Sequence, residues 1–210
     1  MRRANDQPEE SNTAHPCKDC YASRLLSRRT VLKSALGLGV SLHFARVADS
    51  AETDPKKLRP QIGDVFIFSS GDHQGQVVTI RDLPEGGPPA FAYPLDPKTQ
   101  TLRDGSRLNR VLFVHLAQTE LTDPTRAVAA EGVVGYSAIC PHTGCDVSGW
   151  KAETQHLVCP CHASTFDPKD RARVIGGPAP RPLPLLPLRT VDGKVTVAGA
   201  FSARVGAEQK

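Results

Sequence analysis

Four of the six cysteines in this chain of 210 residues lie within the twenty-two residues from 140 to 161. Such close spacing is typical of a metal site or a disulfide, and not of cysteines scattered through a core. Two histidines lie with them, in the boxes Cys140-Pro141-His142-Thr143-Gly144-Cys145 and Cys159-Pro160-Cys161-His162-Ala163-Ser164. Each box is short enough to form one tight loop. Two such loops that face each other would supply two thiolates and two imidazoles.

The residues around the boxes predict a β protein. Aromatic residues make up only 5% of the chain, which has 18 prolines and 17 glycines, and this balance favours loop-rich β structure over a helical bundle. The expected strands are 65–68, 76–80, 91–93, 108–116 and 132–139, then a hairpin of 185–189 and 194–198 across Asp192-Gly193. Asp123-Pro124 marks the start of one helical turn. The pattern predicts an all-β fold, an antiparallel β-sandwich or barrel-like base domain into which the segment with the two boxes is inserted.

The net charge of +4 does not indicate a nucleic-acid-binding protein. Residues 1–50 contain eight Lys/Arg and five Asp/Glu and so carry +3, whereas the remaining residues have 18 basic and 17 acidic side chains. A nearly neutral domain without a basic stripe offers little to a phosphate backbone. We therefore expect no nucleic-acid partner.

The N-terminal residues resemble a twin-arginine export signal. Ser27-Arg28-Arg29-Thr30-Val31-Leu32-Lys33 departs from the usual pattern only at Val31, where Phe is common, and Ser34–Ala45 follows without a formal charge. This stretch is shorter than the roughly 20 residues that span a bilayer, and it has the length of a signal-peptide core. The twin-arginine route exports folded cargo, so the resemblance implies a periplasmic protein. The weak cleavage site Ala48-Asp49-Ser50 leaves open whether the segment is retained as a membrane anchor.

The two boxes resemble the C-x-H-x-G-C and C-x-C-H-x-S motifs of the Rieske [2Fe–2S] family, and residues 177–180 (Gly-Pro-Ala-Pro) resemble its third, proline-rich loop. The resemblance is dense over residues 133–181 and implies the Rieske fold with one [2Fe–2S] cluster. It implies that Cys140 and Cys159 bind one iron and that His142 and His162 bind the other. Neutral imidazoles leave the cluster less negative than four thiolates do, which raises its potential to roughly −150 to +300 mV across the class.

The resemblance also implies a disulfide between Cys145 and Cys161 that joins the two loops and persists in an exported protein. In having this second cysteine pair, the chain resembles the subgroup found in cytochrome bc complexes and arsenite oxidase. The organisation that it implies is a signal or anchor in residues 1–50, a linker in 51–60 and a Rieske domain in 61–205, with the cluster-binding subdomain at about 139–181. Cys17 and Cys20 form a CxxC in the leader, and we interpret them as incidental because no folded frame is expected around them.

Further residues are expected to tune the cluster. Ser164 matches the family serine whose hydroxyl donates to a bridging sulfide, and Phe166 stands where high-potential members carry a tyrosine that donates to a cysteine sulfur. Without that hydrogen bond the reduced state is less stabilised, which predicts a potential below that of quinol-oxidising subunits. Gly144 belongs to the first box, and Pro178 and Pro180 are expected to stiffen the loop that covers the cluster.

Other kinds of site explain fewer of these residues. A zinc site needs four ligands around one ion, which would leave the second cysteine pair and the proline loop unexplained. A cluster bound by four cysteines would make both histidines coincidental.

The resemblance implies single-electron transfer, and two functions of this kind remain open. The first is a periplasmic electron-transfer subunit of an oxidoreductase, similar to the arsenite oxidase small subunit, that passes electrons toward a c-type cytochrome or another redox subunit. The second is the Rieske subunit of a quinol:cytochrome c reductase, whose first box usually has leucine at the position of Thr143. A catalytic oxygenase would need a second domain with a mononuclear iron site, for which no residues remain. We expect the protein alone not to be a catalyst.

Overall fold

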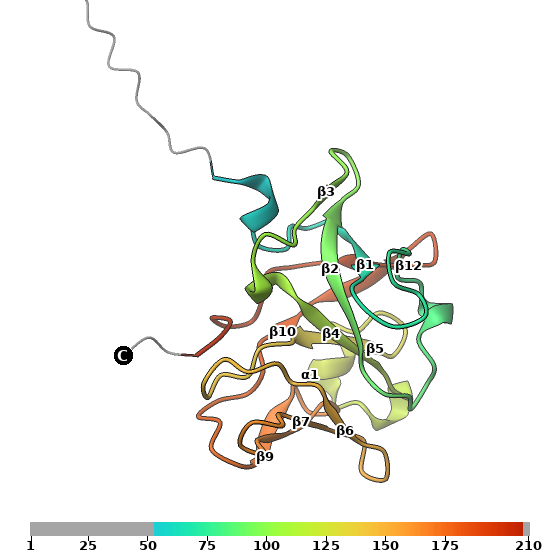
Figure 1. The fold of residues 1–210 in the computed structure, drawn as a ribbon. Helices are drawn as coiled ribbons and strands as arrows, with labels where there is room; N and C mark the ends of the chain where they lie inside the picture. The colour runs from blue at the N-terminus through green and yellow to red at the C-terminus, as the bar shows by residue number, and fades with distance from the viewer. Residues whose placement is uncertain (1–52, 208–210) are drawn as a thin grey trace, which may run out of the picture. The chain divides into compact units, whose positions relative to one another are not determined.

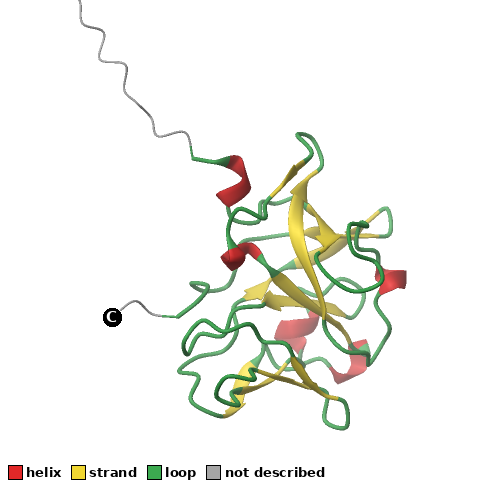
Figure 2. Cartoon of the chain, in the orientation of Figure 1, coloured by secondary structure: helices red, strands yellow, loops and turns green. Residues whose placement is uncertain are grey.

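The computed structural model describes residues 53–207, in which most residues lie in strands and loops (Figure 2). One antiparallel sheet contains β1 (Val65–Phe68), β2 (Ala90–Asp96), β3 (Thr101–Leu102), β4 (Val111–His115), β5 (Val133–Ser137), β10 (Leu185–Leu186), β11 (Leu188–Val191) and β12 (Lys194–Val197). A second contains β6 (Gly149–Lys151), β7 (His156–Val158), β8 (Thr165–Asp167) and β9 (Arg173–Gly176). The helices described are short: α1 (Asp123–Arg126) and the 3-10 turns η1 (Pro55–Lys57), η2 (Ile80–Asp82), η3 (Arg107–Asn109) and η4 (Gln118–Glu120).

The larger sheet curls until its two ends meet. Its strand order is β10-β5-β4-β2-β1-β12-β11, with β3 beside β2. Figure 1 labels all of these strands except β11. β10 and β11 lie at opposite ends of this order, yet only Pro187 separates them in the chain. The backbone N–H of Leu188 then donates to the carbonyl of Val128, 2.9 Å away. The sheet is therefore nearly closed, which confirms the expected all-β antiparallel fold.

The smaller sheet is inserted between two neighbouring strands of the larger one. β5 and β10 pair with each other, and all four strands β6-β7-β8-β9 lie between them in the sequence. One buried cluster joins the sheets, because Leu112 and Tyr136 of the larger sheet pack in the same core as Leu157 and Phe166 of the smaller. The Tyr136 hydroxyl also donates to the carbonyl of Pro168, 2.8 Å away. Hydrophobic burial of this kind is the main force that fixes one sheet on the other.

Most of the expected elements are present, and one is not. The structure confirms the strand at 65–68, and it confirms the strands at 108–116 and 132–139 with fewer residues than expected. The strand expected at 91–93 is longer and covers 90–96, and the helical turn begins at Asp123 as expected. The strand expected at 76–80 is wrong, since this segment forms only isolated bridges, Val77 with Ile67 and Thr79 with Lys194. The physical reason is local: the carboxylate of Asp82 accepts hydrogen bonds from the backbone N–H and the hydroxyl of Thr79, at 3.1 and 2.7 Å, which favours a 3-10 turn.

A buried ion pair holds the start of the larger sheet. Nε of Arg103 lies 2.6 Å from one carboxylate oxygen of Asp64, and Nη2 lies 3.1 Å from the other. Arg103 is 4% exposed and Asp64 is 2% exposed. The hydrogen bond and charge of Asp64 raise the pKa of the Arg103 guanidinium, against the opposing effect of burial. This bidentate pair is therefore a fixed structural element and not a surface contact.

The leader predictions, including the twin-arginine motif and Cys17 and Cys20, lie outside the described residues. Within residues 53–207, no helix is both long enough and apolar enough to span a membrane.

Candidate metal centre

The first box forms a tight loop immediately after β5. The backbone N–H of Cys140 donates to the carbonyl of Cys145 at 2.8 Å, and that of Gly144 donates to the carbonyl of Cys140 at 3.0 Å. An antiparallel bridge between Ile139 and Asp146 closes the base of the loop. Gly144 has a φ of +83°, a left-handed conformation that glycine adopts without steric cost, so the turn explains this glycine of the motif.

The second box forms the loop of the hairpin between β7 and β8. Val158 pairs with Thr165, and the backbone N–H of Cys159 donates to the carbonyl of Ser164 at 2.8 Å. Ala163 turns the chain with a φ of +56°. Both boxes therefore form short loops whose ends are fixed by backbone hydrogen bonds.

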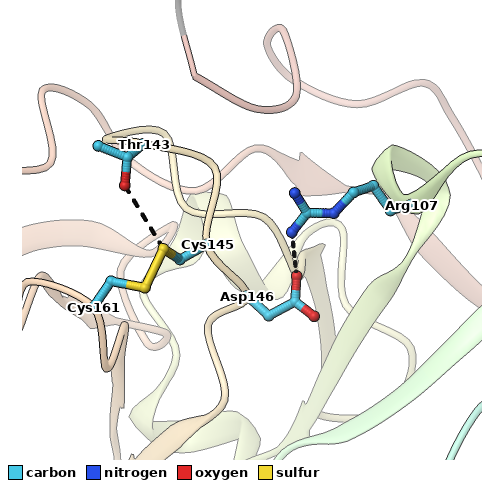
Figure 3. The surroundings of a disulfide bond; sticks show 5 residues. All are labelled: Arg107, Thr143, Cys145, Asp146 and Cys161. Carbon is cyan, nitrogen blue, oxygen red and sulfur yellow. Dashed lines mark hydrogen bonds and ion pairs between the residues drawn. A yellow bond between two sulfur atoms is a disulfide. The ribbon is translucent and has the colours of Figure 1, made fainter.

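The two loops lie side by side and are joined covalently. Cys145 and Cys161 form the disulfide that the resemblance implied, with their Cα atoms 6.5 Å apart (Figure 3). The rings of His142 and His162 meet edge to face, with centroids 4.6 Å apart. The sulfur of Cys159 lies within 4.8 Å of both disulfide sulfurs, but those two are bonded to each other and have no thiolate to offer a metal.

The two remaining thiols are more deeply buried than the histidines. Cys140 and Cys159 are the free cysteines of residues 53–207 and are 0% and 1% exposed, whereas His142 is half-buried and His162 is exposed. Burial raises the pKa of the Cys140 thiol, and the neighbouring Cys159 thiol adds to this rise. A thiolate at this depth needs a compensating positive charge, which iron would supply.

One imidazole nitrogen indicates where such a metal would bind. Nδ1 of His142 is buried and has no hydrogen-bond partner among the described residues. Buried polar atoms in folded proteins are almost always satisfied, so an orphaned acceptor next to two buried thiols fits a metal ligand. The donor set of two thiols and two imidazoles is the one that a Rieske cluster requires.

The proline loop packs directly on the second box. A Cβ atom on Gly177 would lie 2.5 Å from Cα of Ser164 and 2.7 Å from the carbonyl oxygen of Ala163, so only glycine allows this approach. The backbone N–H of Ala179 donates to the hydroxyl oxygen of Ser164, 3.1 Å away. Because that oxygen already accepts this bond, the hydroxyl hydrogen is left to donate elsewhere, and Ser164 contributes a hydrogen bond that lowers the pKa of Cys140 among opposing effects. Sequence reasoning did not identify the role of Gly177, although the Gly176-Gly177 pair was a signal for it.

Sequence reasoning also missed two ion pairs that anchor the first loop. The carboxylate of Asp146, the residue after Cys145, lies 2.7 Å from Arg107 (Figure 3). It also lies 2.9 Å from Arg110. Arg110 also stacks over the ring of Phe91, with its guanidinium carbon 4.5 Å from the centroid. The loop is thereby tied to the larger sheet by side chains far away in the sequence.

The histidines outside the boxes have ordinary structural settings. His115 ends β4, and its Nδ1 lies 2.8 Å from the carbonyl of Leu83. His73 lies in an exposed turn, and His156 begins β7. Among residues 53–207, none of the three makes a hydrogen bond or a ring contact with the two boxes, so none is a candidate ligand.

Comparison with known proteins identifies a Rieske [2Fe-2S] domain over residues 111–187. The chain is 49% identical over 77 residues to the cytochrome bc1 complex Rieske iron-sulfur subunit of Streptomyces lividans, covering 36% of this chain and 45% of that protein. It is 39% identical over 106 residues to a putative respiratory nitrate reductase subunit Rieske of Haloferax mediterranei, covering 50% of this chain and 47% of that protein. The soluble domain of Rieske protein II from Sulfolobus acidocaldarius aligns with a TM-score of 0.36 at 25% identity, over 46% of this chain and 66% of that one.

The aligned region is thus less than half the length of either curated relative. The matched domain runs from β4 through both boxes to the end of β10, so it contains both loops, the disulfide and the proline loop. The chain therefore contains a Rieske [2Fe-2S] domain at residues 111–187, the kind of domain that holds one [2Fe–2S] cluster.

Proposed function

We propose that Cys140 and Cys159 bind one iron of the cluster and that His142 and His162 bind the other. The proposal is supported by the two buried free thiols and by the unpartnered Nδ1 of His142. The disulfide and the two backbone-closed loops hold these side chains without contributing a ligand. Ser164 and Phe166 are proposed to tune the cluster from beneath it, since both are fully buried.

We propose that the protein carries single electrons in the periplasm, as a subunit of an oxidoreductase that passes them toward a c-type cytochrome. When bound, the cluster supplies a one-electron couple. The observation that carries the proposal is the asymmetry of the site, in which the thiols are buried and His162 is exposed. An electron can therefore pass through the imidazole end while the protein shields the sulfur end from water. The twin-arginine resemblance supports the location.

The second candidate is the Rieske subunit of a quinol:cytochrome c reductase. It is favoured by the identity with the Streptomyces lividans bc1 subunit across the domain. Against it stands Thr143, an exposed hydroxyl residue at the tip where that class usually has leucine. Phe166 lacks the hydroxyl that raises the potential in high-potential members.

Electron transfer to a soluble c-type cytochrome tests the first function. The reduced protein, mixed rapidly with oxidised cytochrome, should reduce one haem for each cluster oxidised, and both changes can be followed by absorbance. Isolation of the protein from native membranes in a complex with a b-type cytochrome and with quinol oxidation would instead establish the second function. Failure to reduce the cytochrome would contradict the first.

A hydroxyl introduced at Phe166 is expected to raise the reduction potential. Phe166 is 0% exposed and packs in the same core as Cys140 and Cys159, so the phenol of Phe166→Tyr would lie near their sulfurs. A hydrogen bond to a charged acceptor is worth about 1.5–3 kcal/mol, and only the difference between the redox states appears as a shift. Since a tenfold change in a one-electron equilibrium is about 59 mV, we expect a rise of tens of millivolts.

Protein-film voltammetry measures this shift, with Phe91→Tyr as the matched control. Phe91 is half-buried in β2 beneath Arg110, and a hydroxyl there should leave the potential unchanged. A structure of the Phe166→Tyr protein with the hydroxyl in place but no upward shift would remove the low-potential argument against quinol oxidation.

Loss of the disulfide is expected to weaken cluster retention without removing a ligand. Cys145 and Cys161 are 16 residues apart, and closing a loop of this size is worth about 3 kcal/mol. Cys145→Ser should therefore assemble the cluster poorly or lose it faster to a chelator, as followed by the decay of visible absorbance. A thiol assay should detect Cys161 as a new free thiol. Retention equal to that of the unmodified protein would show that the disulfide does not hold the loops.

A further inference from the structure

A cavity of about 370 Å³ lies beside the proline loop and takes no part in the cluster site. Three segments meet there: the turn between β8 and β9, the end of the proline loop, and the C-terminal segment after β12. Its lining residues are Asp170, Arg171, Arg173, Arg181, Pro182, Ser202 and Ala203. Three of the seven are arginines, and only one is acidic.

The positive charge of this cavity is only partly compensated. Arg173 forms a 2.8 Å ion pair with Asp170 and lies 3.6 Å from Asp167. Arg171 and Arg181 have no carboxylate within 4.0 Å among residues 53–207. Two guanidinium groups, that of the exposed Arg171 and that of the half-buried Arg181, thus line one cavity without a carboxylate partner, so both are available to an anion.

Arg181 is held in place with unused hydrogen-bonding capacity. Its Nη2 donates to the carbonyl of Gly206, whereas its Nη1 is buried and has no partner among the described residues. Pro180 and Pro182 flank it and restrict the backbone on both sides. Beside it, the hydroxyl oxygen of Ser202 accepts from the backbone N–H of Leu185 at 2.9 Å, so its hydrogen is available to a ligand.

Arg171 has a backbone conformation that residues other than glycine rarely adopt. Arg171 and Ala172 have φ values of +51° and +50°, in the left-handed region that glycine adopts at least cost. A residue kept in a disfavoured conformation is a reason to look for a function of its side chain. At Arg171 that function would be to bring a guanidinium to the cavity.

From these contacts we propose that the cavity binds a doubly charged oxyanion of the phosphate class, through Arg171, Arg181 and the Ser202 hydroxyl. Two uncompensated positive charges match a dianion. The planar guanidinium group donates two parallel hydrogen bonds to adjacent phosphate oxygens, which chloride cannot accept in the same way. The cavity is larger than one phosphate ion, so the phosphate group can be free or the phosphomonoester of a larger molecule, such as the headgroup of phosphatidic acid. This proposal does not depend on the electron-transfer function.

Titration of the cluster-loaded protein with inorganic phosphate, at ionic strength held constant with sodium chloride, tests the site. We expect saturable binding to one site by calorimetry, and a melting temperature that rises by about 3–6 °C at a tenfold excess over the dissociation constant. Arg181→Gln should remove both effects, whereas Arg189→Gln, an exposed arginine of β11 that does not line the cavity, should retain both. The proposal would be overturned if calorimetry of the unmodified protein showed only the heat of dilution. It would also be overturned if the unmodified protein, Arg181→Gln and Arg189→Gln responded equally to phosphate.

Arg171→Gly separates anion binding from a structural role of the arginines. Glycine removes the guanidinium and also relieves the left-handed backbone, so the melting temperature in chloride should be no lower than that of the unmodified protein. The rise caused by phosphate should nevertheless be lost. A full phosphate response in Arg171→Gly would contradict the assignment of this residue.

Vesicles distinguish the two sources of the phosphate group. If free phosphate is the ligand, soluble phosphate should bind and phosphatidic acid vesicles should not compete with it. If a lipid headgroup is the ligand, the protein should sediment with those vesicles, Arg181→Gln should not, and phosphate should displace the protein. Absence of binding to both probes would overturn the site.

Discussion

Replacing His162 with alanine is expected to remove the cluster completely. The two histidine rings meet 4.6 Å apart at the outer end of the site, and no other imidazole of residues 53–207 contacts the boxes. Loss of one of four ligands leaves an iron open to water and to exchange. Metal analysis should therefore fall from two irons per chain to nearly none, and the electron paramagnetic resonance signal of the reduced protein should vanish.

His156→Ala is the matched control for this experiment. His156 begins β7 and is half-exposed, only six residues from His162 in the sequence, yet it is not a proposed ligand. This variant should keep its full iron and labile sulfide content with an unchanged spectrum. Full iron content in His162→Ala, or zinc in place of iron in the unmodified protein, would contradict the ligand assignment.

Replacing Asp64 with alanine is expected to destabilise the domain by about 3–5 kcal/mol, because it leaves Arg103 buried without its counter-charge. The carboxylate of Asp64 makes both bonds of the bidentate pair and also accepts from the backbone N–H of Gln61 at 2.8 Å. Asp96 lies 3.6 Å from Arg103 and is a partner of lower burial that cannot replace it. Urea unfolding followed by circular dichroism measures the loss.

Asp72→Ala, at an exposed turn residue without an ion pair among the described residues, should change stability by less than about 0.5 kcal/mol. The double variant Asp64→Ala/Arg103→Met should recover part of the loss, because the unpaired charge is removed together with its partner. A loss below about 1 kcal/mol in Asp64→Ala would mean that water or Asp96 compensates the guanidinium.

Much of the fold was predictable because its determinants are short in sequence. The hairpin of β11 and β12 follows from apolar runs on either side of Asp192-Gly193, where both residues have left-handed φ values. The 76–80 strand failed for a related reason: its apolar residues suit a strand, but Asp82 bonds back to Thr79, and no neighbour pairs continuously with Val77. The segment does have neighbours, because it shares backbone hydrogen bonds with β1 and β12, but it pairs with each only through an isolated bridge. Apolar content therefore does not by itself predict a continuous strand.

The sequence by itself determined the chemistry of the site, because each box brings its donors together within six residues. The disulfide pairing and the ligand assignment came from the family motif. Only the tertiary structure decided which thiols are buried, that Gly177 must approach Ser164 closely, and that Asp146 ties the first loop to Arg107 and Arg110. The cavity of Arg171 and Arg181 likewise exists only where distant segments meet. Contacts between distant residues depend on how the larger sheet closes, and that closure results from packing many apolar residues at once and from no single local pattern.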